Sequence, residues 1–321
     1  DFYIEDVLIN ILLWTLSPSE IIIVITSKKK IKINEYIKKS LKKKNISLVL
    51  VYKKNFFPGA ARNIGILKAK YDYLAFLDMN TLPYSKDWLK INLEYVLKNN
   101  LAGVFGQTFY LATSKAEKII RASTFGKALL STIPGSIFLK KAVLEVGFFD
   151  SKTRAGEDTE WLRRLSKLNL KITKAVYPIH YKGLYNTSYM IILKKWFRNY
   201  YHSSHLPHMS LQKNFYVFLL FFIFFFIAYN INLFILQWQS PDELYFPHIT
   251  KIFLIISFIS YTVIRGVYMP IKKKINYKYL FPKNFFYVTV FSIALDFVKM
   301  LTFFSATLWS LLNKSIYKKQ K

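Results

Sequence analysis

The sequence contains no cysteine, and its acidic residues are few. Without cysteine there are no disulfide bonds, zinc–thiolate sites, iron–sulfur clusters or thiol nucleophiles. The 18 Asp and Glu residues stand against 47 Lys and Arg residues, so the net charge is +29. Charged residues make up only 20% of the chain and hydrophobic residues 53%, which excludes a disordered or collagen-like protein.

The excess of positive charge favours an anionic partner, such as nucleic acid, lipid headgroups or phosphorylated substrates. Lys, Ile, Asn, Phe and Tyr are abundant together, and AT-rich coding would also produce this composition. We find no helix-turn-helix, zinc or RNP-like signature, so we expect no nucleic-acid partner. The lysine-rich stretch 28–44 is either a patch for anionic lipid headgroups or the solvated face of a helix.

At 321 residues the chain can hold one large domain or two ordinary ones, and its composition changes near residue 210. We therefore predict an α/β domain over residues 1–205 and a membrane region over residues 206–321. The chain begins with Asp1 rather than Met, and no signal peptide precedes the first helical pattern. We therefore expect translation to start upstream.

Before residue 210, short apolar runs alternate with amphipathic stretches. The predicted strands are Ile21–Ile25, Leu48–Tyr52 and Tyr73–Leu77. The predicted helices are Glu5–Leu16, Ile31–Lys44, Ala60–Lys70 and Asp87–Leu97, the last capped by Ser85. Strands that alternate with helices predict a mixed, mostly parallel α/β sheet.

Beyond residue 210 the sequence predicts membrane helices. Phe215–Ser240 contains no charged residue, and about 20 helical residues cross a hydrocarbon core of about 30 Å. The predicted hydrophobic helices cover about 215–238, 249–269 and 285–312. Asp296 and Lys299 interrupt the third at i,i+3 spacing, so this segment either buries an ion pair or is interfacial or re-entrant.

The distribution of charge orients these segments. Four basic residues precede the first segment, and five lysines follow the second, whereas the connection between them carries Asp242 and Glu243 and no Lys or Arg. The positive-inside rule therefore predicts an integral membrane protein whose α/β domain is cytoplasmic. The basic C-terminal tail also favours the cytoplasm, which fits a third segment that does not fully cross.

Two motifs follow predicted strands. Pro58-Gly59-Ala60-Ala61-Arg62-Asn63 begins a helix, where free N–H groups and Arg62 can hold a phosphate, although many such turns bind nothing. Asp78-Met79-Asn80 follows Tyr73–Leu77, at the edge where open α/β sheets place ligands. Asp78 and Asn80 could hold Mg²⁺ or Mn²⁺ on a diphosphate; otherwise Asp78 only caps a turn.

A third set of residues lies between 134 and 165. Pro134-Gly135-Ser136 is followed by Gly147-Phe148-Phe149-Asp150, and then Glu157 and Asp158 open a helix rich in acidic residues. The N-terminal helix dipole keeps such carboxylates ionised, and an ionised carboxylate in a cleft can act as general base on a hydroxyl. The alternative is that these acids serve only the helix terminus.

In order and spacing, these motifs resemble the family-two glycosyltransferases. The matching segments are PGAARN, FLDMNTLP, PGSIFLKKAVLEVGFFD and AGEDTEWLRRL, which together span Pro58 to Leu165. The resemblance implies a type A glycosyltransferase fold with a Rossmann-like mixed sheet. It also implies that the chain binds a nucleotide-sugar and transfers the sugar with inversion.

The resemblance also implies roles for single residues. Asp78 stands where the family's first metal-site Asp contacts the nucleotide and a divalent cation (Mg²⁺ or Mn²⁺), Asn80 stands at the second metal position, and Asp158 matches the general base. Gly59, Arg62 and Asn63 would bind the nucleotide-sugar. Gly135, Ser136 and Glu157 would line the acceptor side. His180 stands where many members have a His that is sometimes on the metal, although a lone His is more often structural.

The sequence also departs from the family pattern. The opening strand is absent or truncated, with Asp1–Tyr3 as its possible remnant, and the second strand ends in Val24-Ile25-Thr26-Ser27-Lys28 instead of an Asp-rich turn. Asn80 in place of Asp removes a negative charge from the metal site. No Gln-x-x-Arg-Trp motif is present, which argues against a processive polysaccharide synthase.

We therefore expect a membrane-anchored inverting glycosyltransferase that acts at the cytoplasmic face on a lipid-linked or cell-envelope glycan acceptor. One alternative is a polyprenyl-phosphate sugar synthase, whose phosphate acceptor needs no base. The other is a non-catalytic membrane binding or scaffold protein of the same fold. Met190–Tyr201, which interleaves aromatic and basic residues, is either a helix in the lipid headgroup plane or a docking helix of the catalytic domain.

Overall fold

The structure is a computed structural model that describes residues 2–27, 31–184, 187–235 and 246–318. The chain divides into two compact units. The first unit comprises Asp1–Thr113 and Ala128–Tyr185, and the second comprises Ser114–Lys127 and Asn186–Lys321. The assignment of residues 1–205 to catalysis and 206–321 to the membrane stays a prediction.

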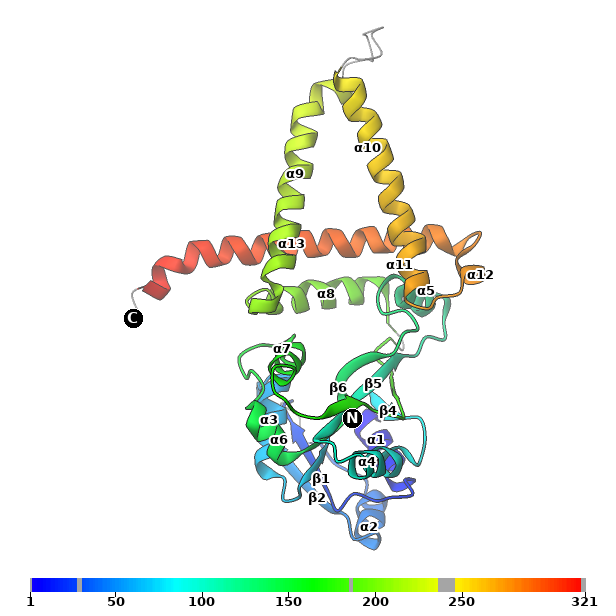
Figure 1. The fold of residues 1–321 in the computed structure, drawn as a ribbon, viewed down its shortest axis with the longest axis vertical. Helices are drawn as coiled ribbons and strands as arrows, with labels where there is room; N and C mark the ends of the chain where they lie inside the picture. The colour runs from blue at the N-terminus through cyan, green and yellow to red at the C-terminus, as the bar shows by residue number, and fades with distance from the viewer. Residues whose placement is uncertain (1, 28–30, 185–186, 236–245, 319–321) are drawn as a thin grey trace. The chain divides into compact units, whose positions relative to one another are not determined.

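The first unit is an α/β domain in which strands and helices alternate, as predicted. Its strands are β1 (Glu20–Ile25), β2 (Ser47–Tyr52), β3 (Tyr73–Ala75), β4 (Thr81–Pro83), β5 (Gly103–Tyr110), β6 (Leu130–Leu139), β7 (Ile172–Lys174) and β8 (Ile179–Tyr181). Its helices are α1 (Phe2–Leu12), α2 (Glu35–Lys43), α3 (Pro58–Lys68), α4 (Trp88–Lys98), α6 (Lys140–Val146) and α7 (Glu157–Leu165). Figure 1 shows these helices around the strands.

The predicted mixed sheet is confirmed. β1 and β2 pair in parallel, and the larger sheet has the order β3-β6-β5-β8-β4, with β7 also pairing with β5. In the larger sheet β5 pairs in parallel with β7 and β8, whereas the β3–β6, β5–β6 and β4–β8 pairs are antiparallel. Antiparallel pairing is therefore as common as parallel pairing among the described strands.

The larger sheet is buried on both faces. Because successive strand residues point to opposite faces, Ile137 and Phe138 of β6 enter different cores. Ile137 packs with Val104 and with Trp88 of α4, whereas Phe138 packs with Ile66 of α3, Val143 of α6 and Trp161 of α7. The core around Phe138 thus brings α3 and α7 together, and these two helices carry most of the candidate site.

Three local predictions need correction. Phe2 and Tyr3 belong to α1 and are therefore not the remnant of a strand, while Asp1 lies outside the described residues. β3 ends at Ala75, two residues before the predicted end. Ser85 is not the cap of α4: Asp87 occupies that position, and the Ser85 hydroxyl accepts a hydrogen bond from the Asp87 N–H at 3.1 Å.

The lysines of α2 lie on a solvated face. Ile37 and Leu41 are buried on the opposite face of this helix. Exposed lysines occupy this face: Lys38, Lys39, Lys42 and Lys43. Their exposure is compatible with both predicted alternatives, a solvated helix face and a patch for lipid headgroups. The predicted stretch begins at Lys28–Lys30, which lie outside the described residues.

The second unit is helical. It contains α5 (Lys115–Ser123), α8 (Tyr189–Ser203), η1 (Pro207–Met209), α9 (Ser210–Ile235), α10 (Phe246–Val263), η2 (Ile264–Tyr268), α11 (Met269–Lys272), α12 (Tyr277–Leu280) and α13 (Asn284–Lys318). Three segments are long and apolar enough to cross a membrane, which agrees with the predicted hydrophobic helices. They are Pro207–Ala228, Lys251–Lys272 and Asn284–Leu312. Asp242 and Glu243, used above for orientation, lie outside the described residues.

Candidate active site

The site begins at the first turn of α3, where Pro58 opens the helix and Gly59 faces another segment of backbone. A Cβ atom on Gly59 would lie 2.1 Å from the carbonyl oxygen of Asp150. A side chain is therefore excluded at this position, and the backbone of α3 packs directly on the loop before α7. This close approach brings Arg62, one turn later, towards the start of α7.

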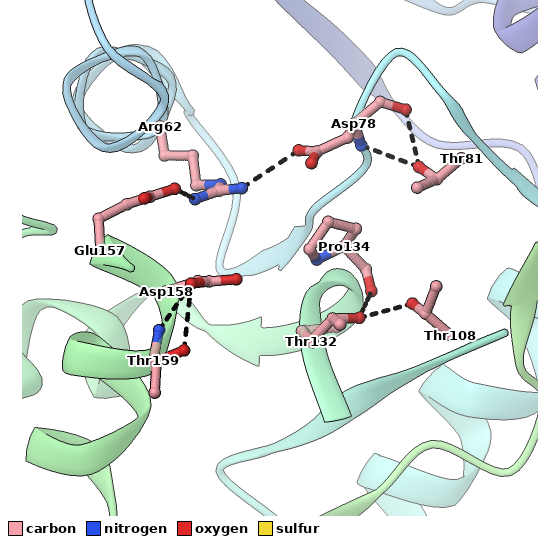
Figure 2. A network of polar contacts seen from close by, with 10 residues as sticks. Arg62, Asp78, Thr81, Thr108, Thr132, Pro134, Glu157, Asp158 and Thr159 are labelled. Carbon is pink, nitrogen blue, oxygen red and sulfur yellow. Dashed lines mark hydrogen bonds and ion pairs between the residues drawn. The ribbon is translucent and has the colours of Figure 1, made fainter. Parts of the chain in front are cut away.

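Arg62 joins two segments that are far apart in the sequence. Its Nη1 donates to Glu157 Oε1 at 2.7 Å, and its Nη2 donates to Asp78 Oδ1 at 3.3 Å (Figure 2). The guanidinium also lies 5.5 Å from the centre of the Phe149 ring. Because the Arg62 side chain is only 12% exposed, these contacts are largely shielded from water.

Asp78 is held by a tight turn at the end of β3. Its N–H donates to Thr81 Oγ1 at 2.9 Å, and the Thr81 hydroxyl donates back to the Asp78 carbonyl at 2.7 Å (Figure 2). The Asp78 side chain remains 42% exposed. Asn80 is anchored through its backbone carbonyl, which accepts from the Lys182 N–H at 2.8 Å. The turn therefore fixes the backbone and leaves the Asp78 carboxylate accessible.

Glu157 and Asp158 are the first two residues of α7, preceded by Gly156 at φ 90°. Glu157 is buried, and this burial raises its pKa to about 7 although Arg62 acts in the opposite direction. Asp158 is partly exposed, and its Oδ1 accepts from the Thr159 N–H at 2.8 Å. The two neighbouring carboxyl groups therefore have different surroundings. The Glu157 carboxyl is buried against the Arg62 guanidinium, whereas the Asp158 carboxylate is accessible at the start of α7.

Three carboxylates surround Arg62. Burial lowers the pKa of Arg62, but the charges of Asp78, Glu157 and Asp158 raise it above its ordinary value. Figure 2 shows the carboxylates of Glu157 and Asp78 on either side of this guanidinium, with Asp158 below it. The structure thus brings together four of the predicted site residues from α3, the β3–β4 turn and α7.

The side chains of Asn63 and Ser136 form hydrogen bonds with backbone groups of neighbouring segments. Asn63 Nδ2 donates to the Phe149 carbonyl at 2.8 Å, and Asn63 Oδ1 accepts from the Phe149 N–H at 2.9 Å. Ser136 is fully buried; its Oγ accepts from the Gly106 N–H at 2.8 Å and donates to the Thr132 carbonyl at 2.9 Å. Their predicted ligand contacts would require these hydrogen bonds to break.

Gly135 is required by the backbone. Its φ is +83°, and a Cβ atom would lie 2.9 Å from the Ile179 side chain. Its N–H donates to the Phe76 carbonyl at 2.7 Å, which joins β6 to the segment before Asp78. Gly135 is therefore close to Asp78 along the sheet, and its predicted place on the acceptor side stays a prediction.

His180 lies in β8 among aromatic rings. Its ring centre is 4.1 Å from that of Phe109 and 4.9 Å from that of Tyr84, and burial lowers its pKa. Within the described part of the chain, no three His, Asp or Glu residues are grouped closely enough to hold a metal ion. The metal-binding roles of Asp78, Asn80 and His180 stay predictions.

Tyr110 lies near Asp78 and Asp158, and the sequence analysis did not single it out. It ends β5, and its ring centre lies 4.8 Å from that of Tyr181. Burial raises the pKa of its hydroxyl, and the charges of Tyr181, Asp158 and Asp78 raise it further. Its position at a strand end was the available signal, but aromatic residues are so frequent in this chain that it did not stand out.

The solved structures to which this chain is similar include two nucleotide-sugar complexes. Staphylococcus aureus TarS (residues 1–349) in complex with UDP-GlcNAc is 12% identical, with a TM-score of 0.41 over 61% of this chain and 62% of that chain. The mannosyltransferase PcManGT from Pyrobaculum calidifontis, in complex with GDP-Man and Mn²⁺, is also 12% identical. Its TM-score is 0.43 over 65% of this chain and 60% of that chain.

Curated relatives match just under half of the chain. An uncharacterized glycosyltransferase of Rickettsia felis is 30% identical over 160 residues, which are 46% of this chain and 26% of the relative. A counterpart from Rickettsia conorii is 30% identical over 157 residues. The chain spans about a quarter of the length of these relatives. Residues 3–151 match the model of glycosyl transferase family 2. This match identifies a glycosyltransferase family 2 domain in this part of the chain.

Proposed function

We propose that this chain is a membrane-anchored inverting glycosyltransferase that transfers a sugar from a nucleotide-sugar to a lipid-linked or cell-envelope glycan acceptor. The observation that carries the proposal is the position of Arg62, which joins Asp78 to Glu157 and so brings the predicted donor side close to Asp158. The family 2 domain supplies the reaction class. The membrane attachment is supported by the three apolar helices.

Asp78 is proposed to hold the donor side. Its exposed carboxylate supplies the oxygen donor that Mg²⁺ or Mn²⁺ prefers, and Asn80 lies two residues further on. Such cations commonly use one or two protein carboxylates together with substrate phosphates, so a full protein cage is not needed. When bound, the cation neutralises the charge that develops on the departing nucleoside diphosphate.

Asp158 is proposed to be the general base. Its carboxylate is accessible at the start of α7, where the helix dipole favours the ionised form. It accepts the proton of the acceptor hydroxyl while the hydroxyl oxygen attacks the anomeric carbon from the face opposite the diphosphate. Glu157 is buried on Arg62 and is proposed to position the site instead.

The cytoplasmic location is proposed from the lysine distribution. The loop after the second candidate span contains Lys273, Lys274, Lys278 and Lys283, and basic residues also precede the first span. Under the positive-inside rule these segments remain in the cytoplasm.

The test uses the full chain in membranes and measures nucleoside diphosphate release from a panel of UDP- and GDP-sugars, with and without Mn²⁺. Asp158→Asn should lower turnover about 10²- to 10⁴-fold, the usual contribution of a general base, and leave donor affinity by calorimetry unchanged. Glu94→Gln, an exposed carboxylate change on α4, is the matched control and should leave both unchanged.

Two results would redirect the proposal. Undiminished turnover in Asp158→Asn would favour a polyprenyl-phosphate sugar synthase, because a phosphate acceptor needs no base. An absence of metal-dependent affinity for every nucleotide-sugar in the panel would favour a non-catalytic membrane protein of the same fold.

A further inference from the structure

α13 differs from α9 and α10 in its surroundings, although all three include candidate membrane spans. Half of the residues in its apolar window are buried within the structure, compared with 0% for the first span and 6% for the second. In Figure 1, α9 and α10 run steeply away from α13, whereas α8 runs alongside it. α13 therefore already has protein partners along one face.

α8 covers α13 over a long distance. The ring of Tyr189 lies 4.9 Å from that of Phe291, and the ring of Tyr200 lies 5.4 Å from that of Phe303. These pairs advance by 11 residues on α8 and by 12 on α13, so the two helices run parallel for about 18 Å. Lys194 and Arg198 of α8 are exposed. The partner of α13 is therefore a helix with a charged, solvated side.

α5 covers the beginning of α13. Ser123 Oγ donates to the Val288 carbonyl at 3.2 Å, and the Lys115 ammonium lies 4.9 Å from the centre of the Tyr287 ring. Lys115 and Lys118 are exposed residues of α5. Placing each such charge at the centre of a membrane helix costs about 2.5–3.5 kcal/mol on insertion scales. A bilayer-spanning α13 would draw α5 and α8 into hydrocarbon with it.

The middle of α13 is joined to the other two candidate spans by a buried ionic cluster. Asp296 pairs with Arg265 at 2.6 Å and with Lys299 at 3.1 Å. Its carboxylate also accepts from the hydroxyls of Tyr261 at 2.7 Å and Tyr216 at 3.2 Å. The cluster thus fixes which part of α13 contacts α9, α10 and η2.

The partners of Asp296 lie at one end of the α9–α10 pair. Tyr216 is in the second turn of α9, and Arg265 is the second residue of η2, which follows α10. Asp296 and Lys299 lie near the middle of Asn284–Leu312. The cluster therefore joins the middle of α13 to the first turns of α9 and to the end of α10.

The uncovered face of α13 is apolar. Its exposed large hydrophobic residues recur at intervals of four and seven residues, or about one and two helical turns, and so lie on one stripe. They include Phe286, Val290, Phe297, Leu301 and Leu308. Lysines precede this stripe in the sequence: Lys278 lies in α12, and Lys283 comes just before α13. An apolar stripe preceded by lysines matches the boundary of an anionic lipid layer.

We propose that α13 lies in the plane of the membrane surface, with this stripe in the boundary between headgroups and acyl chains and with α5 and α8 on its aqueous side. Only α9 and α10 then cross the bilayer. The inference rests on the membrane attachment in the proposed function. It does not depend on the chemistry of the family 2 domain.

The absence of cysteine makes a direct test possible, because any introduced cysteine is the single thiol in the chain. The full chain is reconstituted into vesicles of phosphatidylglycerol and phosphatidylcholine, with a spin label at Val290→Cys, Phe297→Cys, Leu301→Cys or Leu308→Cys. All four labels should report a similar depth of about 5–10 Å, as for an interfacial helix. Phe222→Cys on α9 is the control and should report a position deep in the hydrocarbon.

A depth that rises to a maximum near Phe297 and falls on both sides would overturn the proposal, as would four labels that lie in water. Labelling with a membrane-impermeant maleimide provides a second readout. Asn284→Cys and Leu312→Cys should react from the same side of sealed vesicles, and reaction from opposite sides would show that α13 crosses. Sugar transfer is measured on the same variants, so a failure of the proposed activity is distinguished from a failure of this topology.

Discussion

Arg62 of α3 donates a hydrogen bond to Glu157 of α7 at 2.7 Å, and both side chains are shielded from water. The pair is the centre of the site because Arg62 also reaches Asp78 and because Asp158 follows Glu157 in the chain. A buried charge is stable only when it is paired and hydrogen-bonded. The stability of the domain and the arrangement of the site therefore depend on the same contact.

Arg62→Met should destabilise the chain by about 3–5 kcal/mol, because it leaves the Glu157 carboxyl buried without its partner. Urea unfolding of the full chain in detergent measures the change. Combining it with Glu157→Gln forms a double-mutant cycle, in which the double variant should lose less than the sum of the single losses. Strict additivity would show that the two side chains are not coupled.

The stability of the chain should depend on pH through Glu157. Its pKa is about 7 in the folded chain, compared with an ordinary value of 4.5, so the folded state binds this proton more tightly than the unfolded state. The stability contributed by the protonated carboxyl is complete below about pH 4.5 and is lost as the pH rises through about 7. Unfolding measured over this range should show a decline that is smaller in Glu157→Gln. Parallel curves for the two proteins would contradict the assignment.

Gly59→Ala should distort the site, because the added Cβ would lie 2.1 Å from the Asp150 carbonyl oxygen. Relief of this clash requires α3 to move relative to the loop before α7. We expect a loss of about 1–3 kcal/mol, as for overpacking elsewhere, together with lower transferase turnover. Gly65→Ala is the control in the same helix, since its nearest neighbour would be 4.0 Å away. That change should stabilise α3 slightly, and equal losses in the two variants would exclude the steric explanation.

Asn63→Ala should remove both hydrogen bonds to the Phe149 backbone and leave that N–H and carbonyl without their partner. With a net value of about 1 kcal/mol for each bond, we expect a loss of about 2 kcal/mol in urea unfolding. Asn99→Ala, which removes one exposed hydrogen bond within α4, should cost less. If Asn63→Ala is as stable as the unmodified chain but binds donor poorly, Asn63 is a ligand residue as first predicted.

The alternation of strands and helices and the apolar C-terminal helices could be read from the sequence, because hydrophobic periodicity depends on neighbours within one element. The ordered motifs from Pro58 to Leu165 likewise indicated the family before any contact was known. The exact helix ends could not be read in this way. α1 begins at Phe2 and β3 ends at Ala75 because packing and hydrogen bonding with distant segments decide where an element stops.

The sequence by itself determined which residues are candidates for chemistry, and the tertiary structure decided which groups each of them contacts. Asn63 and Ser136 resemble ligand residues in the motifs, yet their polar atoms bond to backbone groups of segments that fold against them. α13 has the composition of a spanning helix, yet α5, α8 and the Asp296 cluster occupy one of its faces. The physical reason is the same in each case: composition sets what a side chain can bind, whereas long-range packing sets which partner it meets.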